Sequence, residues 1–172
     1  MRWRGLEMSL TDYFARKPQF EIFPLETSDL GQAAAIHQLG FKRCWSDGEL
    51  HALLAQSTVF GFIARQSNAV SRPLTGGFVL FRIAGGEAEI LTICVDPRFS
   101  RLGLGWRLMR AAIRETRDQA AEAMFLEVDE TNLAAVGLYR KLAFAKVGER
   151  QAYYQDESGK RTSALVMRLD LG

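Results

Sequence analysis

Hydrophobic positions along the chain repeat with two different periods, and their succession predicts a mixed α/β fold. Near-helical spacing of apolar residues indicates a helix, whereas alternation or a short apolar run between turn residues indicates a strand. A βαβ crossover is therefore expected at the centre of the chain, after a first half rich in hairpins. Helices are expected within 28–41, 42–56, 104–120 and 131–144, and strands within 21–26, 57–65, 75–84, 85–97, 123–130, 145–154 and 161–171.

Local signals refine the helix boundaries. Ser28 or Asp29 is expected to cap the first helix, and Ser46 followed by Glu49 forms a capping box before the second. The helix within 104–120 has an apolar face and an opposite face that carries arginines diluted by acids, which predicts a solvated surface rather than a nucleic-acid interface. The apolar face comprises Leu104, Leu108, Ala112 and Ile113, and the arginines are Arg107, Arg110, Arg114 and Arg117.

Composition narrows the class of protein. The 172 residues suit one domain, which we place at 21–172 after an N-terminal extension at 1–20. The chain is 48% hydrophobic and 24% charged, as soluble globular proteins are, and its net charge of +2 is too small to indicate nucleic-acid binding. No apolar run is long enough for a membrane span and the start does not resemble a signal peptide, so a cytoplasmic protein is expected.

The metal-binding and redox residues are few and scattered. Cys44 and Cys94 form no CxxC or Cys/His cluster, so neither a disulfide scaffold nor a metal site is predicted. Cys94 lies in a strand-like run and is interpreted as a small apolar core residue. His37 and His51 both fall in helix-like segments, where a structural role is the more common one.

The stretch `SRLGLGWRL`, residues 100–108, joins a predicted strand to a predicted helix. Gly103 and Gly105 allow the backbone to approach a ligand closely, and the N–H groups at a helix start bind anions. The stretch lacks the Gly-Lys-Ser/Thr of a P-loop, and Leu108 stands where a dinucleotide fingerprint needs a small residue. It therefore predicts a phosphate site, without naming the phosphate.

Three longer motifs carry a resemblance to a known family. `VDPRFSRLGLGWRLM`, `LEVDETNLAAVGLYRKLAF` and `YYQDESGKRTSALVM` follow one another as in the GNAT acetyltransferases. The chain resembles this family from about residue 21 to residue 169, and within it the RimI type, which acetylates the N-terminal alanine of a small-subunit ribosomal protein. The resemblance implies a central mixed twisted sheet of six to seven strands, about four flanking helices, and splayed parallel strands 4 and 5.

The resemblance also implies a cofactor, acetyl-CoA as the acetyl donor, with no metal. The strand before the glycines would pair with the pantetheine arm, the loop N–H groups would hold the pyrophosphate, and a later helix would contribute one further contact. These cofactor residues are Ile93, Cys94 and Val95; Arg101, Leu102, Gly103, Leu104, Gly105 and Trp106; and Asn132, which is also a candidate helix cap.

Two residues match the catalytic positions of the family. Glu127 lies between Leu126 and Val128 in a predicted strand, so it faces away from them, and the resemblance makes it the general base, acting through water. Tyr139 would be the general acid that protonates the departing thiolate. The N–H of Val95 is a candidate donor to the oxyanion.

A general base needs to deprotonate a smaller fraction of the acceptor when the acceptor is an N-terminal α-amine than when it is a lysine. An α-amino group has a pKa of about 8 and a lysine about 10.4, so roughly 10% of the former is neutral at pH 7 against ~0.04% of the latter. A protein N-terminus is therefore the expected acceptor, with a ribosomal protein as one candidate partner and with neither nucleic acid nor membrane expected as partners. Lysine or small-amine acetylation remains an alternative, as does a non-catalytic acyl-CoA-binding module.

Three positions depart from the family pattern. Ser100 replaces a usual Gln or Arg, Ala143 replaces the glycine that ends a helix, and Ser163 replaces an acid usual in the RimI type. A left-handed alanine at 143 would cost about 1–2 kcal/mol. The segments `RCWSDGEL` and `YYQDESGK` are expected to frame the acceptor, and acids within them are candidates to steer a basic N-terminus: Asp47, Glu49, Asp156 and Glu157.

Overall fold

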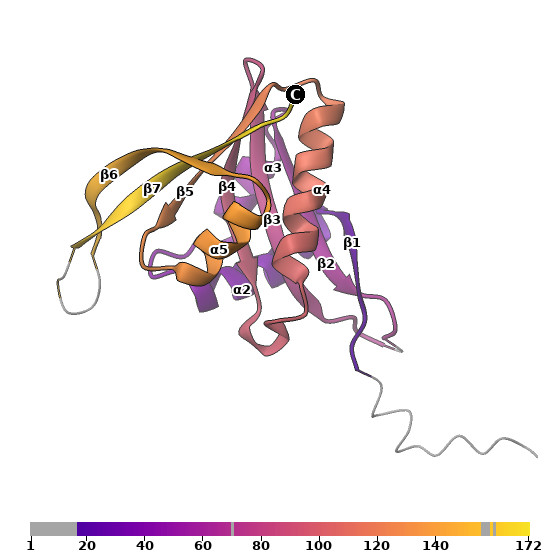
Figure 1. Cartoon of the computed structure of the whole chain (residues 1–172). Helices are drawn as coiled ribbons and strands as arrows, with labels where there is room; N and C mark the ends of the chain where they lie inside the picture. Colours follow the sequence, from indigo (N-terminus) through magenta and orange to yellow (C-terminus); the bar gives the residue numbers. More distant parts are fainter. Residues whose placement is uncertain (1–16, 70, 156–158, 160) are drawn as a thin grey trace, which may run out of the picture.

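Figure 1 shows the computed structural model of the chain, in which residues 17–69, 71–155, 159 and 161–172 are described. Most of the predicted extension at 1–20 lies outside these residues, and so do Asp156 and Glu157. Within the described part, seven strands form one mixed sheet in the order β1-β2-β3-β4-β5-β7-β6.

The order of elements along the chain is the predicted one. The helices are α2 (Leu30–Gly40), α3 (Asp47–Leu54), α4 (Leu104–Asp118) and α5 (Leu133–Lys141), with two short 3-10 turns at Thr27–Asp29 and Pro97–Phe99. The strands are β1 (Phe20–Pro24), β2 (Val59–Gln66), β3 (Thr75–Ala84), β4 (Glu87–Val95), β5 (Ala123–Asp129), β6 (Ala145–Gln155) and β7 (Arg161–Asp170).

The sheet separates two hydrophobic cores. α4 and α5 cover one face, and α2 and α3 cover the other (Figure 1). The alternation of β3 supplies both: Val79 and Phe81 belong to the core under α4, whereas Phe78 and Leu80 belong to the core under α2. Because successive strand residues point to opposite faces, a central strand covered on both sides is apolar throughout.

The amphipathic helix α4 is confirmed. Its predicted apolar residues are buried, and Met109 and Thr116 join them. Thr116 is accommodated because its hydroxyl donates to the Ala112 carbonyl at 2.8 Å. The four arginines of the opposite face are exposed, as predicted for a solvated surface.

The helix caps follow the sequence in part. The Ser46 and Glu49 capping box is present, with both reciprocal hydrogen bonds made. Asp29 occupies the N-cap position of α2, but its carboxylate does not cap that helix. It accepts from Arg65 Nη2 at 2.8 and 2.9 Å, a charge-assisted contact, and from the Glu26 N–H at 3.0 Å in a capping box of the preceding 3-10 turn.

Candidate active site

The sheet opens between its two parallel strands. β4 and β5 pair only at Glu87↔Ala123, Ala88↔Met124 and Glu89↔Phe125, and the ladder stops there. The Asp96 N–H donates to the Gly76 carbonyl of β3 at 2.9 Å. Antiparallel strands alternate, so the backbone groups of Cys94 also face β3, whereas those of Ile93 and Val95 point into the opening.

The turn that follows β4 is stabilised by hydrogen bonds between Asp96 and Arg98. The buried carboxylate of Asp96 accepts from the Arg98 N–H at 2.9 Å and binds the Arg98 guanidinium at 2.7 Å. These hydrogen bonds with Arg98 keep the pKa of Asp96 below its usual range, so the aspartate stays ionised. The Asp96–Arg98 contact therefore stabilises the start of the loop that leads into α4.

The start of α4 presents unsatisfied donors. Gly103 is the N-cap with φ 72°, and it has no side chain with which to cap the helix. The Arg107 N–H bonds the Gly103 carbonyl at 3.1 Å, so the three preceding N–H groups of the helix lack an intrahelical acceptor. Arg101 also has a left-handed φ of 67°, which bends the backbone just before the helix. This is a suitable cradle for an anion.

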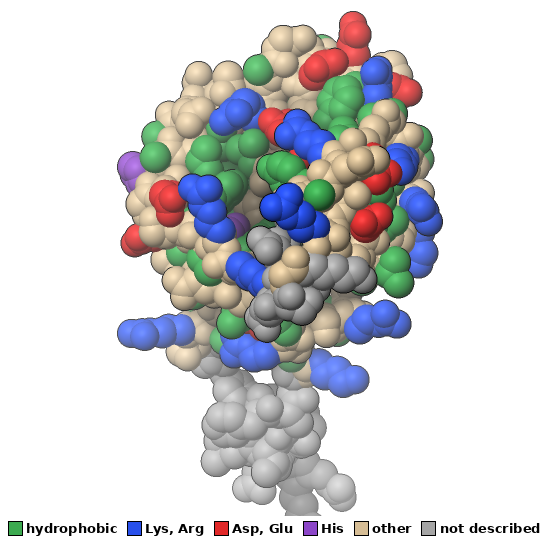
Figure 2. Space-filling model, turned by 90° about the vertical axis from the view of Figure 1, so that its left-hand side faces the viewer, with side chains coloured by type: hydrophobic (Ala, Val, Ile, Leu, Met, Phe, Trp, Pro, Cys, Tyr) green, Lys and Arg blue, Asp and Glu red, His purple; other side chains and the backbone are tan. Residues whose placement is uncertain are grey.

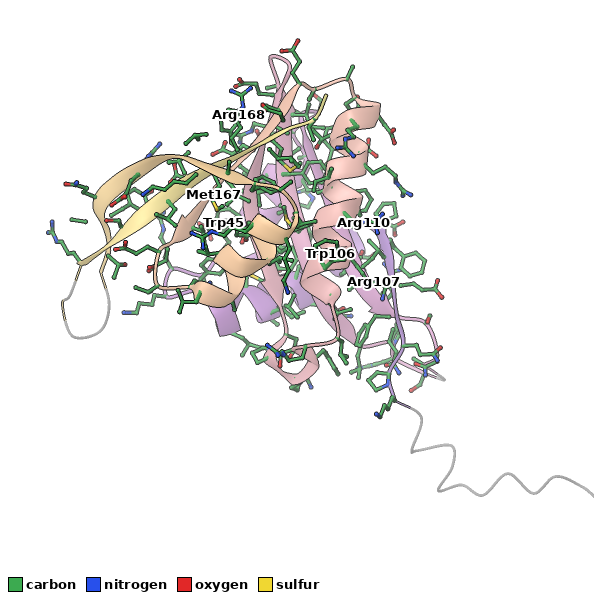
Figure 3. All side chains as sticks on the ribbon, in the orientation of Figure 1. Trp45, Trp106, Arg107, Arg110, Met167 and Arg168 are labelled. Atoms are coloured by element: carbon green, nitrogen blue, oxygen red, sulfur yellow. The ribbon has the colours of Figure 1, made fainter. Side chains whose placement is uncertain are left out.

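Gly105 brings three elements together. A Cβ at this position would stand 3.2 Å from Leu138 of α5 and 3.8 Å from Val95 of β4. The glycine is thus needed for close packing, and it places the start of α4 beside the open end of β4. In Figure 3, Arg107 and Arg110 lie on the side of α4 turned away from α5, and Trp106 lies on the side towards it.

Tyr139 follows Leu138 on α5 and is buried in the core that α4 and α5 share. The helix ends just beyond it in a Schellman motif: the Phe144 N–H bonds the Tyr139 carbonyl, and the Ala143 N–H bonds the Arg140 carbonyl, both at 3.0 Å. Ala143 has φ 68°, so the missing glycine has not changed how the helix ends. The opposite end is capped by Asn132, whose side chain accepts from the Ala135 N–H at 3.2 Å.

Glu127 lies on the other face of the sheet. Leu126 and Val128 are buried in the core with Tyr139, so strand alternation turns Glu127 towards the side of α2 and α3. Its side chain is 26% exposed and its Oε1 forms an ion pair with Arg150 Nη2 at 3.0 Å. Tyr139 and Glu127 thus lie on opposite faces of the sheet.

Arg150 is the residue that sequence reasoning missed. It comes from β6, which is separated from β5 in the sheet by β7. The sequence predicts that Arg150 lies in a strand after Tyr139. It does not predict which residue the Arg150 side chain contacts, because that partner is distant in the chain. Figure 2 views this side of the molecule and shows Lys and Arg side chains on both sides of a hollow with hydrophobic side chains inside it.

The acids expected to steer an acceptor are engaged locally where they are described. Glu49 accepts from the Ser46 N–H at 2.8 Å, and the hydrogen bonds from the Ser46 N–H and hydroxyl lower its pKa. Asp47 accepts from the Gly48 N–H at 2.8 Å. At Ser163, where the family has an acid, the backbone N–H donates to Glu130 at 2.9 Å.

The histidine and cysteine near this face are core residues. His37 is stacked between Phe41 and Trp45, and its Nδ1 accepts from the Trp45 N–H at 3.1 Å. Burial lowers the pKa of His37. Burial also raises the pKa of Cys94 to about 12, as fits the small apolar residue that the sequence predicts.

The described residues contain neither a metal-binding cluster nor a membrane-spanning helix. No group of three or more His, Cys, Asp or Glu side chains among them could hold a metal ion. None of the helices in the described part of the chain is both long and apolar enough to cross a membrane.

Comparison with known proteins agrees with this geometry. Residues 17–144 match the acetyltransferase (GNAT) family. The chain is 31% identical over 150 residues to the [ribosomal protein bS18]-alanine N-acetyltransferase of Escherichia coli strain K12, covering 87% of this chain and 97% of the relative. It is 38% identical over 86 residues to the N-alpha-acetyltransferase RimI of Mycobacterium tuberculosis, covering 50% and 51% of the two chains.

Solved structures give the same result. The crystal structure of the ribosomal-protein-S18-alanine N-acetyltransferase from Escherichia coli superposes with a TM-score of 0.80 and 29% identity, over 90% of this chain and 95% of that one. Arabidopsis thaliana NAA60 in complex with acetyl-CoA shares the fold at a TM-score of 0.76 and 18% identity, over 88% and 98%.

The open parallel pair offers backbone groups to a ligand, and the uncapped helix start beside it is suited to an anion. The chain belongs to the acetyltransferase (GNAT) family. It is an N-acetyltransferase, and acetyl-CoA is its acetyl donor.

Proposed function

We propose that this chain acetylates the N-terminal α-amine of a protein, and that the alanine N-terminus of ribosomal protein bS18 is the first acceptor to test. The acceptor class rests on one observation, the match to the bS18-alanine N-acetyltransferase of Escherichia coli over nearly the whole of both chains. The geometry around Glu127 and Tyr139 supports the chemistry.

The residues around the opening fit the donor. The backbone groups of Ile93 and Val95 are oriented to pair with a pantetheine arm as an added strand would. The N–H groups from Arg101 to Trp106 surround the uncapped start of α4, where a pyrophosphate is favoured by the helix dipole. Asn132 caps α5 through its oxygen, which leaves its amide N–H groups for the cofactor.

Proton transfer is divided between the two faces of the sheet. Acetyl-CoA supplies a thioester carbonyl, which the neutral amine attacks as the C–N bond forms and the C–S bond breaks. Glu127 takes the amine proton through a water molecule, and Tyr139 gives its hydroxyl proton to the thiolate. The Val95 N–H donates to the carbonyl oxygen as negative charge develops there.

The function is tested with acetyl-CoA and peptides that differ at residue one, with lysine-containing peptides blocked at the N-terminus and free polyamines as controls. Products are assigned by mass spectrometry. We expect acetylation at the α-amine, with alanine among the accepted first residues. Acetylation confined to lysine or to free amines would refute the N-terminal acceptor, and tight CoA binding without any turnover would indicate a binding module.

Tyr139→Phe tests the general acid. Loss of the proton donor should lower kcat by roughly 10²–10⁴-fold, the usual contribution of such a group, with little change in the KM for acetyl-CoA. Unchanged kcat would remove Tyr139 from the mechanism. Thermal unfolding of the variant is measured in parallel, because the side chain is also part of the core.

Glu127→Gln tests the base through its pH dependence. An α-amine is mostly protonated at pH 7 and almost wholly neutral at pH 9.5, since its pKa is about 8. The variant should therefore lose most activity at pH 7 and recover towards wild type at pH 9.5. Glu89→Gln, an exposed change on β4, is the matched control. An equal loss at both pH values would contradict the role.

A further inference from the structure

The carboxylate of Glu127 contacts a residue from a strand that does not pair with its own. Arg150 of β6 lies opposite Ala164 on β7, and Glu127 of β5 lies opposite Val166, so the two side chains meet diagonally across β7. Arg150 Nη2 is 3.0 Å from Glu127 Oε1. Gly148, opposite Val166 on β6, has no side chain that would occupy the space beside it. Three strands therefore build this one contact.

A second carboxylate on the same face of β5 has other partners. Asp129 lies directly across β7 from Arg150, because both are opposite the same β7 residue. Its Oδ1 accepts from the Thr131 N–H and hydroxyl at 2.9 and 2.7 Å, and its Oδ2 accepts from the Thr162 hydroxyl at 2.9 Å. Both Asp129 oxygens are thus hydrogen-bonded, and the guanidinium forms its ion pair with Glu127.

A bulge in β6 places an aromatic ring against the guanidinium. Between Arg150 and Tyr154, β6 advances further than the facing part of β7, and Ala152 within this stretch has φ 52°. The centroid of the Tyr153 ring lies 5.7 Å from the Arg150 guanidinium carbon. Bulges commonly re-aim a side chain beside an active site, and a guanidinium over an aromatic ring is favourable. Arg150 therefore has a support within β6 as well as a partner on β5.

These contacts add little to the free energy of unfolding. The Arg150 side chain is 59% exposed, and exposed ion pairs contribute little to stability. Their effect is on the position of the Glu127 carboxylate, because a long side chain loses conformational entropy when it is ordered. An ion pair to a supported guanidinium orders the Glu127 side chain before any acceptor binds.

A base that acts through water depends on a fixed carboxylate. The amine proton passes to a water molecule and from it to Glu127, so the amine, the water and the carboxylate must each be within hydrogen-bond distance of the next. A small displacement of a catalytic group can lower the rate strongly. A carboxylate has about four lone-pair sites on its two oxygens, so an ion pair at Oε1 leaves Glu127 the capacity to bind that water.

We propose that Arg150 is a positioning residue, which holds the Glu127 carboxylate where it binds the water that carries the amine proton. A guanidinium suits this task because it stays charged and presents its donors in a fixed plane. In this role Arg150 acts only through Glu127 and binds neither the acceptor nor acetyl-CoA. The proposal rests on the proposed function, in which Glu127 is the base.

A double-mutant cycle tests the proposal. We would measure kcat and KM at pH 7 for wild type, Arg150→Gln, Glu127→Gln and the double variant, with the best acceptor among the peptides and free amines. Arg150→Lys is the conservative variant, and Arg114→Gln, the same change on the exposed side of α4, is the matched control. Thermal unfolding is measured in parallel. Because any acetylated amine serves in the cycle, acetylation confined to lysine would refute the N-terminal acceptor and still allow Arg150 to be tested.

We expect Arg150→Gln to lower kcat about tenfold, the scale of the freedom of one long side chain, with little change in the KM for acetyl-CoA or in the melting temperature. In the Glu127→Gln background the same substitution should have no further effect, because two residues that act as a unit are not additive. Arg150→Lys should retain more activity than Arg150→Gln because it keeps the charge, and Arg114→Gln should match wild type.

The pH dependence separates positioning from a general structural role. With an α-amine acceptor, the loss in Arg150→Gln should be largest at pH 7 and should shrink at pH 9.5, where the amine is neutral without a base. Unchanged kcat in Arg150→Gln, an additive loss in the double variant, or an equal loss at both pH values would overturn the proposal. Full activity of Glu127→Gln would overturn it together with the assignment of the base.

Discussion

Ala143 carries strain that a single substitution should relieve. Its φ of 68° places it in the left-handed region, where a Cβ meets the following carbonyl oxygen at a cost of about 1–2 kcal/mol. Glycine has no such contact, but it costs roughly 0.5–1 kcal/mol through the greater entropy of the unfolded chain. Ala143→Gly should therefore raise the free energy of unfolding by about 0.5–1 kcal/mol.

The measurement is the urea midpoint together with the melting temperature, which should rise by about 1–4 °C for a chain of this size. Ala111→Gly is the control, because Ala111 is in the interior of α4, where glycine costs about 1 kcal/mol relative to alanine. The two substitutions should shift stability in opposite directions. A loss of stability in Ala143→Gly would refute the reasoning, because it would mean that the left-handed conformation carries no penalty here.

Three further outcomes follow from the packing. Gly105→Ala should weaken acetyl-CoA binding, measured by calorimetry, because its Cβ would press on α5 at 3.2 Å; unchanged affinity would show that the contact yields freely. Cys94, with a pKa raised to about 12, should resist iodoacetamide at pH 8 in the folded Cys44→Ser variant, and rapid labelling would contradict its burial. Burial lowers the pKa of His37, so the unfolded chain binds a proton at His37 at higher pH than the folded chain does. The free energy of unfolding should therefore be unaffected by His37 above about pH 6.5 and should decrease below that pH. His37→Asn, whose side-chain oxygen can still accept from the Trp45 N–H, should flatten that fall in melts from pH 7.5 to pH 5, and an unchanged slope would assign it elsewhere.

Local chemistry made much of the fold predictable. The capping box of Ser46 and Glu49 involves atoms three residues apart, so the sequence contains both partners. The two faces of α4 follow from the helical period alone. Gly103 takes a left-handed φ at a helix start, as a glycine in a strand-to-helix turn can without strain. The order of strands and helices was predicted on the same grounds, since each depends on a short window of residues.

Local sequence patterns do not predict contacts between residues that are distant in the chain. Ser28 or Asp29 is the expected cap of α2, but the Asp29 carboxylate binds the Arg65 guanidinium, 36 positions away, and the Glu26 N–H rather than an N–H of α2. The side of β4 on which Ile93 and Val95 present their backbone groups depends on its register with β3, which no local signal fixes.

The sequence by itself determined that Glu127 and Tyr139 lie on a strand and on the helix after it, because alternation and helical spacing are properties of the local chain. Only the tertiary structure decided that they lie on opposite faces of one sheet, and that Arg150 forms an ion pair with Glu127. The physical reason is that strand pairing and bulges bring side chains together across the sheet, and their register depends on the packing of the whole core.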